Sequence, residues 1–213
     1  MLQIKTFIFN PVQENTYLLY DETKEAVIID CGASTDNEKK QLSEFITENG
    51  LTVKHALNTH LHFDHILGNS YLLETYGLRP EYNSKDEGMP GVKEGIIKFA
   101  LATFKYPFIS AGQYLEDGAI ITFGNTHLKA IATPGHSPGS LSFYSEKDAC
   151  VFTGDALFRF NIGRTDLWGG NYEELVYSIK TRLLTLPENT VVYPGHEMAS
   201  VIGKEIKHNP YLK

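Results

Sequence analysis

The amino-acid sequence predicts a layered α/β fold. Short β-branched and aromatic runs recur in both halves of the chain, and a polar segment with apolar residues at helical spacing follows the third run. A strand and a second helix come next, before the second half returns to strands. This succession is typical of helices packed on sheets and argues against an all-β protein.

The first part of the chain is predicted to form a meander of strands. Asn-Pro and Asp-Glu-Thr-Lys turns separate runs that are rich in β-branched and aromatic residues. The expected strands are 6–9, 16–20 and 26–30. Cys31-Gly32-Ala33 ends the third strand.

Two predicted helices enclose one further strand. Residues 34–49 are polar with apolar positions at helical spacing, and Gly50 offers a C-terminal stop. Residues 53–57 form an apolar run and are expected to be a strand. The apolar residues that follow predict one amphipathic helix. They are Ile66, Leu67, Leu72, Leu73 and Tyr76.

Residues 78–112 carry a weaker signal. One interpretation is an ordinary packed helix over 93–108, because the apolar cluster within 96–106 is too dense for a fully solvated one. The other is a lid insertion, because irregular insertions often border active sites. Three lysines are candidates for contact with an anionic substrate, with simple solvation as the alternative. They are Lys93, Lys98 and Lys105.

The second half is predicted to return to short strands joined by tight turns. The expected strands are 119–123, 127–132, 140–144, 150–152 and 190–193. The length of 213 residues favours one domain spanning the whole chain, 1–213.

Composition limits the functional classes. The chain is 42% hydrophobic with a formal net charge of -7, which argues against bulk binding to nucleic acid or to anionic membranes. Neither a secretory signal nor a segment of membrane-spanning length is found, so a cytoplasmic protein is expected. Cys31 and Cys150 form no CxxC pair and are expected to be small core residues.

The loop after residue 57 concentrates ligand chemistry. In extended backbone His60 and His62 project to the same side and can hold one cation together. Asp64 and His65 come where the chain turns into the predicted helix, so we expect them to face a second cation. Imidazole and carboxylate ligands with open positions are typical of a catalytic metal site.

Three later strand ends carry single ligands beside glycine. They are His136 in TPGHSPGS, Asp155 in TGD and His196 in YPGH. One such residue would be an incidental turn residue, but three together indicate a site. The remaining histidines lack this setting and are expected to be structural or surface residues. They are His55, His127 and His208.

The motifs THLHFDH, TPGHSPGS, GDALF, GRTD and YPGHE, in this order, resemble the metallo-β-lactamase superfamily. Within it they resemble the glyoxalase II type, or hydroxyacylglutathione hydrolase. The resemblance covers essentially the whole chain and implies a four-layer αββα sandwich, with the metals at one edge between two sheets.

The resemblance also implies two metal sites. His60, His62 and His136 would hold the first ion, and Asp64, His65 and His196 the second. Asp155 would bridge both. The implied cofactors are two divalent ions, zinc first, with iron or manganese as alternatives. A shared water with a pKa lowered toward about 7 would attack a thioester carbonyl, and Asp64 would orient it.

Departures from the family pattern narrow the type. His62 stands where dioxygen-reducing di-iron members carry Glu, and many true β-lactamases lack a histidine at the place of His65. The chain ends 17 residues after His196 (213 minus 196), so the helical glutathione-binding domain of full-length glyoxalase II is not expected. The short single-domain bacterial type is the better match.

Substrate contacts are expected from two arginines. Arg164 in GRTD suits a carboxylate bidentately, with an ion pair to Asp166 as the alternative, and Arg159 lies close by. Trp168, the only tryptophan, is expected to be a packing anchor. The expected partner is a small-molecule thioester, and the sequence does not indicate an oligomeric state.

Two other functional classes remain open. A persulfide dioxygenase shares the resemblance and GRTD, and would hold one iron with two histidines and an aspartate, here His60 or an equivalent residue with His136 and Asp155. A metal-binding module without catalysis is the other class, although a structural zinc site is closed and this set supplies seven ligands.

Overall fold

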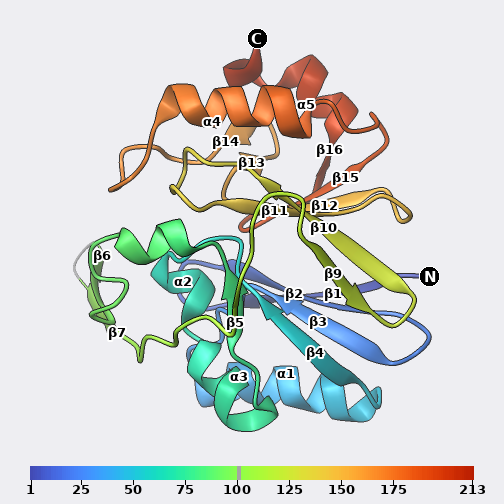
Figure 1. Ribbon diagram of the computed structural model, residues 1–213, viewed down its shortest axis with the longest axis vertical. Helices are drawn as coiled ribbons and strands as arrows, with labels where there is room; N and C mark the ends of the chain where they lie inside the picture. Colours follow the sequence, from blue (N-terminus) through green and yellow to red (C-terminus); the bar gives the residue numbers. More distant parts are fainter. Residues whose placement is uncertain (100–101) are drawn as a thin grey trace.

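The computed structural model describes residues 1–99 and 102–213, which form four layers (Figure 1). Helices α1 and α3 cover one six-stranded sheet, and helices α4 and α5 cover a second one. The predicted αββα sandwich is confirmed, whereas the prediction of a single domain stays a prediction. In the described ranges, no helix has both the length and the apolar character needed to cross a bilayer.

The first sheet contains the N-terminal meander. Its order is β1 (Gln3–Phe9), β2 (Glu14–Tyr20), β3 (Glu25–Ile29), β4 (Thr52–Leu57), β5 (Pro80–Tyr82) and β8 (Gln113–Tyr114). Pairing is antiparallel from β1 to β3 and parallel from β3 to β8. Helix α1 (Asp36–Glu48) makes the crossover to β4, and Thr35 and Glu38 begin it with a reciprocal capping box.

The second sheet is formed by the later strands. Its order is β16 (Ser200–Val201), β15 (Val191–Pro194), β12 (Cys150–Gly154), β11 (Leu141–Ser145), β10 (Thr126–Ala132) and β9 (Ile120–Phe123). β12 and β15 are parallel. A small hairpin, β13 (Leu157–Phe158) and β14 (Asn161–Ile162), follows β12. The outer layer is α4 (Tyr172–Ser178), which continues as a π-helical turn (Ile179–Leu183), and α5 (Ile202–His208) before a 3-10 turn (Pro210–Leu212).

The central strands are buried on both faces. In β2, Leu19 packs between the two sheets with Val27, while Leu18 packs against α1 with Leu42. Because side chains on a strand alternate with period two, one strand contributes to two hydrophobic layers. A fully buried Leu contributes roughly 1.5–3 kcal/mol, so these layers fix how the two halves of the chain meet.

The single helix predicted after residue 65 is wrong, because the structure divides it into α2 (Phe63–Ile66) and α3 (Asn69–Tyr76). The break falls at Gly68, whose amide donates to the carbonyl oxygen of Cys31 at 2.8 Å. A Cβ at Gly68 would lie 2.3 Å from the sulfur of Cys31, so the chain passes too close there for another side chain.

The helix predicted over 93–108 is also wrong. After the 3-10 turn η1 (Ser84–Gly88), the chain forms an antiparallel hairpin of β6 (Ile96–Phe99) and β7 (Ala102–Lys105). Ile96 is 47% exposed and Ile97 is half-buried, an alternation that suits a strand. Residues 100 and 101 of the expected apolar cluster and the side chain of Lys98 lie outside the described part. The lid stays a prediction.

His55 on β4 links three strands. Its Nδ1 lies 2.7 Å from Glu81 Oε1, and its Nε2 lies 3.2 Å from the carbonyl oxygen of Thr122. The hydrogen bond with Glu81 raises the pKa of His55, although partial burial opposes the charged form. The stabilisation is therefore complete below the unfolded pKa of about 6.5 and is lost as the pH rises through the folded pKa.

We predict that His55→Gln lowers the free energy of unfolding by about 1 kcal/mol at pH 5.5 and by less at pH 9, as measured by urea denaturation. Exposed His127 on β10 offers the matched control. The free energy of unfolding of His127→Gln should differ from that of the wild type by the same amount at both pH values. A loss that is the same at both pH values for His55→Gln would contradict the role of the ion pair.

Candidate metal centre

The predicted ligands come together where strands of both sheets end. His60 and His62 follow β4, and His136 follows β10. Asp155 follows β12, and His196 follows β15. Because β3 and β4 are parallel, as are β12 and β15, the carboxyl ends of each pair lie at one edge, where two sheets can present side chains to each other.

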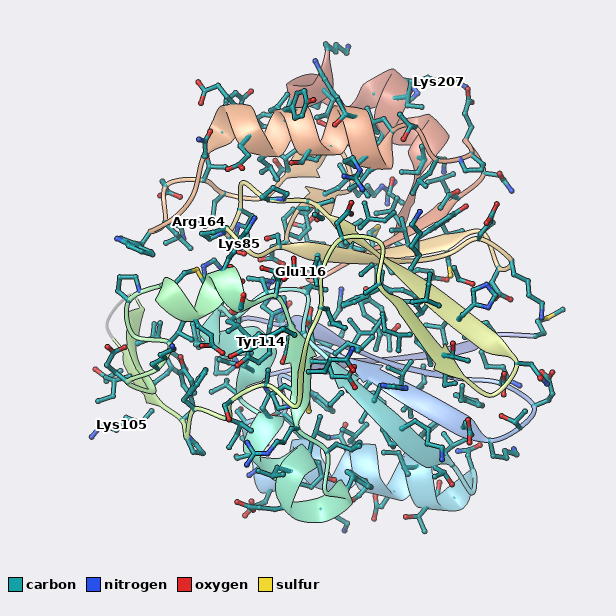
Figure 2. All side chains as sticks on the ribbon, viewed as in Figure 1. Lys85, Lys105, Tyr114, Glu116, Arg164 and Lys207 are labelled. Atoms are coloured by element: carbon teal, nitrogen blue, oxygen red, sulfur yellow. The ribbon has the colours of Figure 1, made fainter. Side chains whose placement is uncertain are left out.

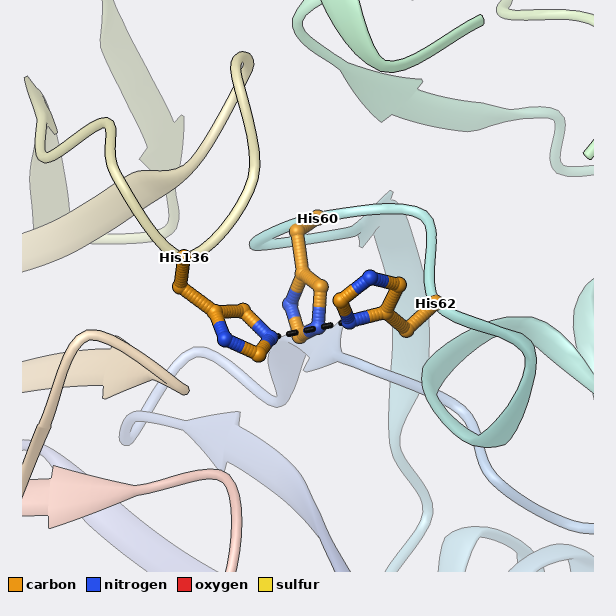
Figure 3. Close-up of side chains that lie close together, drawn as sticks. All are labelled: His60, His62 and His136. Atoms are coloured by element: carbon orange, nitrogen blue, oxygen red, sulfur yellow. Dashed lines mark hydrogen bonds between the residues drawn. The ribbon is translucent and has the colours of Figure 1, made fainter. Parts of the chain in front are cut away.

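The ligand atoms form two main groups. His60, His62 and His136 make the first (Figure 3), and Asp64, His65 and His196 make the second. Within each group one ligand atom per residue lies within 4.8 Å of the others. These groups match the two half-sites expected from the loop, while their assignment to particular ions stays a prediction.

Asp155 lies between the groups. Its Oδ2 is 3.6 Å from Nε2 of both His136 and His196, and its Oδ1 is 3.4 Å from Nε2 of His65. Oδ2 therefore faces one imidazole of each group, and Oδ1 faces a second imidazole of the second group. A bridging ligand needs this arrangement.

The contacts of the Nδ1 atoms, which face away from the site, fix the tautomers of the imidazoles. The Nδ1 atoms of His65, His136 and His196 lie near acceptors, namely Asp30 Oδ2 at 2.9 Å and the carbonyl oxygens of Arg164 at 2.8 Å and Gln13 at 3.3 Å. Each Nδ1 must then carry the hydrogen. In the neutral form of each ring the Nε2 lone pair is left to point into the site, as metal ligation requires.

Thr59 fixes His60 in the same way. Its hydroxyl donates to Asp30 Oδ2 at 2.7 Å, so its oxygen is free to accept from His60 Nδ1 at 3.0 Å. Three buried atoms of the site then have no hydrogen-bond partner among the described residues: His60 Nε2, His65 Nε2 and Asp155 Oδ1. Buried polar atoms are normally satisfied, so these residues fit divalent cations.

Charge supports the same conclusion. Three carboxylates face the site, of which Asp30 and Asp64 are buried and Asp155 is partly buried, and in the described ranges no lysine or arginine forms an ion pair with them. Burial opposes the charged form of His65, but these carboxylates outweigh it and raise the pKa of His65 well above its ordinary value. Burial lowers the pKa of His62 to about 3. Burial also lowers the pKa of His60 and His136. Burial opposes the charged form of His196 too, but its hydrogen bond with Asp64 raises the pKa of His196. The second group therefore favours positive charge, whereas the imidazoles of the first group favour the neutral form.

Asp30 is a site residue that the sequence reasoning missed. Its carboxylate accepts from the Thr59 amide at 2.7 Å, the Thr59 hydroxyl and His65 Nδ1. It thus holds the ligand loop in place from the end of β3. The only signal in the sequence was the position of Asp30 directly after β3, the strand that pairs with β4. A lone aspartate at a strand end is too common to predict such a role.

Asp86 joins the two ligand loops and was also missed. From η1 its Oδ2 accepts from the Leu61 amide at 3.0 Å and from the Ser137 hydroxyl at 2.9 Å, and its Oδ1 accepts from the Gly139 amide at 2.5 Å. Burial raises the pKa of Asp86 to about 6, although the three donors favour the ionised form. The loops that carry His60 and His136 are therefore held by one buried carboxyl group.

A cavity of about 570 Å³ opens on the ligand groups, and its lining includes Arg164 and Trp168. The Arg164 guanidinium makes two bonds of 2.8 Å with Asp166, the alternative that the sequence left open. Arg159 is exposed, lies outside the lining, and contacts the Met198 sulfur and the Phe160 ring. Trp168 is 60% exposed, so the expectation of a packing anchor is wrong.

The profile of the metallo-beta-lactamase superfamily matches residues 9–196. The chain belongs to this superfamily. The protein is therefore an enzyme of the metallo-hydrolase type. The resemblance expected from its motifs is confirmed.

Relatives within the superfamily differ in described activity. The probable metallo-hydrolase YqgX of Bacillus subtilis is 38% identical, with 95% of this chain and 93% of the relative covered. Hydroxyacylglutathione hydrolase GloC of Haemophilus influenzae is 34% identical, with 94% and 93% covered. The mitochondrial persulfide dioxygenase ETHE1 of Bos taurus is 36% identical, with 92% and 70% covered.

Solved structures agree with the fold. The B3 metallo-beta-lactamase BLEG-1 superposes with a TM-score of 0.86 at 34% identity, covering 99% of this chain and 100% of the other. TTHA1623, solved in a di-iron-bound form, gives a TM-score of 0.79 at 34% identity, covering 98% and 100%.

We predict that Asp155→Asn reduces the metal content from about two ions per chain to one or fewer, because the amide loses the charge and one acceptor oxygen. Elemental analysis after dialysis measures this. Asp36→Asn, an exposed change in the first turn of α1, should leave the content unaltered. If Asp155→Asn retained two tightly bound ions, the prediction that Asp155 is a ligand of both would be wrong.

We predict that Asp86→Ala lowers the free energy of unfolding by about 3 kcal/mol, because three buried donors lose their acceptor. Chemical denaturation measures the loss, and zinc affinity should fall with it because both ligand loops loosen. Asp86→Asn keeps one acceptor oxygen and should lose less. Wild-type stability in Asp86→Ala would show that the loops do not depend on this clamp.

Proposed function

We propose that this enzyme hydrolyses thioesters of the glyoxalase II type, such as S-2-hydroxyacyl derivatives of glutathione, at a dinuclear metal centre. The observation that carries the proposal is the pair of three-ligand groups facing each other across Asp155, with its oxygens 3.4 to 3.6 Å from imidazoles of both. The relation to GloC supports it. Two divalent cations bound there would lower the pKa of a water toward about 7 and supply hydroxide at neutral pH.

The protein's own groups would position the reaction. Asp64 lines the cavity, and its Oδ2 lies 3.1 Å from His196 Nε2, so its other oxygen is available to accept a hydrogen bond from the nucleophile. Although burial favours the neutral form, His65 and His196 lower the pKa of Asp64 below its ordinary value. Asp64 therefore stays an acceptor at neutral pH and orients the nucleophile toward the substrate carbonyl.

The remaining parts of the proposal follow from the site. Zinc is the first metal to test, with iron and manganese next, because imidazole and carboxylate ligands suit all three. The proposed partner is a small-molecule thioester bound in the cavity, and the proposed location is the cytoplasm. Neither nucleic acid nor a membrane is a proposed partner.

A persulfide dioxygenase is the second candidate, and the relation to ETHE1 favours it. His60, His136 and Asp155 would supply two imidazoles and one carboxylate to a single iron, the facial set of non-heme oxygenases. Oxidation would then use two imidazoles of the first group and Asp155, without the second group. Metal stoichiometry and oxygen consumption distinguish the two functions.

The test is the initial rate of S-lactoylglutathione hydrolysis by zinc-reconstituted protein. We predict a rate that falls by about a thousandfold or more in Asp64→Ala, because the variant loses a metal ligand and the orienting carboxylate. Asp36→Asn serves again as the surface control. Oxygen uptake with a persulfide in the iron-loaded protein, without thioester hydrolysis, would replace the proposal by the second candidate. A β-lactam is assayed in parallel, because BLEG-1 is a β-lactamase.

A further inference from the structure

The cavity lining contains two chemically different sets of side chains. Metal-ligand side chains form one set, and apolar side chains from two separate segments form the other. Met89 and Val92 lie between η1 and β6 and Ile97 lies in β6, whereas Leu167 and Trp168 come from the loop before α4. Both segments lie on the same side of the sandwich (Figure 1). We call these five side chains the outer compartment.

Trp168 is held at the rim by its backbone. The Asn171 amide donates to the Gly135 carbonyl oxygen at 2.7 Å, and the Gly170 amide donates to that of Leu167 at 2.9 Å. The first bond attaches the loop to the segment that carries His136, and the second closes a turn within the loop. An indole ring 60% exposed on an anchored loop presents apolar surface that a ligand can cover.

The charge of the lining limits the ligand. Among the described cavity residues Arg164 is the only lysine or arginine, and Asp166 already binds it bidentately. Figure 2 labels Arg164, which lies on the same side of the sandwich as the β6–β7 hairpin. On the neighbouring insertion, Lys93 pairs with Glu87 at 2.9 Å. The carboxylates of glutathione or the phosphates of coenzyme A would thus meet no unpaired cation in this lining, and a desolvated anion without a partner binds poorly.

We infer that the outer compartment binds a neutral aliphatic or aryl group, carried on the acyl or the thiol side of the thioester, in preference to the charged carrier of lactoylglutathione. The inference rests on the proposed thioester hydrolysis. Each buried methylene is worth about 0.8 kcal/mol, so four that are half-buried give about 1.6 kcal/mol, roughly a tenfold gain in kcat/KM.

Two substrate series test the inference and identify the side that binds. The acyl series is acetyl, butanoyl and hexanoyl N-acetylcysteamine, and the thiol series is the acetyl thioesters of ethanethiol, hexanethiol and benzyl mercaptan. We predict that kcat/KM rises about tenfold along one series, and that Trp168→Ala reduces this ratio to about twofold. Tyr177→Ala, an exposed aromatic on α4 outside the cavity lining, should keep the full ratio.

A binding measurement separates this inference from the proposed reaction. Trp168 is the only tryptophan, so its fluorescence reports binding of the uncleavable thioethers S-hexyl and S-ethyl N-acetylcysteamine, which differ by four methylenes. We expect the hexyl compound to bind about tenfold more tightly. If no thioester is cleaved but this difference in affinity appears, the proposed reaction is wrong and the inference about the outer compartment is supported. If thioesters are hydrolysed but neither kcat/KM nor affinity depends on chain length, the inference about the outer compartment is wrong.

Discussion

The convergence of three carboxylates at the junction of the two sheets is the constraint on which the structure depends. Asp30 follows β3, Asp64 lies in α2 and Asp155 follows β12, and such desolvated charges would cost several kcal/mol each if they were left without compensation. Imidazoles from the loops after β4, β10 and β15 converge on them. The same negative charge that makes this edge unfavourable for a packed core makes it favourable for divalent cations.

Hydrogen bonds between the sheets keep this charged edge in register. Asn15 of β2 donates through its side-chain amide to the carbonyl oxygens of Pro194 and Glu197, and the Tyr17 hydroxyl donates to Pro194 as well. From the other direction, the Leu141 amide donates to the Thr59 carbonyl oxygen at 2.8 Å. The two ligand groups therefore sit on loops whose relative position is set by the sandwich itself, which preorganises a site before any ligand arrives.

The sequence contained most of the fold and the ligand set, but not their support. His60, His62, Asp64 and His65 stand out because four ligands in six positions serve no packing purpose. The supporting carboxylates and the helix α4 lack such a signal, because their roles depend on partners far away in the chain. The hairpin after η1 was misread for a related reason: a dense apolar run has the same composition in a helix and in a strand. Trp168 was misread because its exposure follows from how its loop is anchored.

The link between the two ligand groups bears on the reaction class. Thr59 receives the hydrogen of His60 Nδ1 and donates its own to Asp30, and Asp30 also holds His65. One chain of bonds thus orients a ligand of each group, so the second group is built into the support of the first. The proposed dinuclear hydrolase would use both groups that this support orients, whereas a mononuclear oxygenase would leave Asp64 paired with His65 and His196 alone, at 3.6 and 3.1 Å from its Oδ2. In either case this support lies behind the ligands, and substrate choice is left to the segments around the cavity.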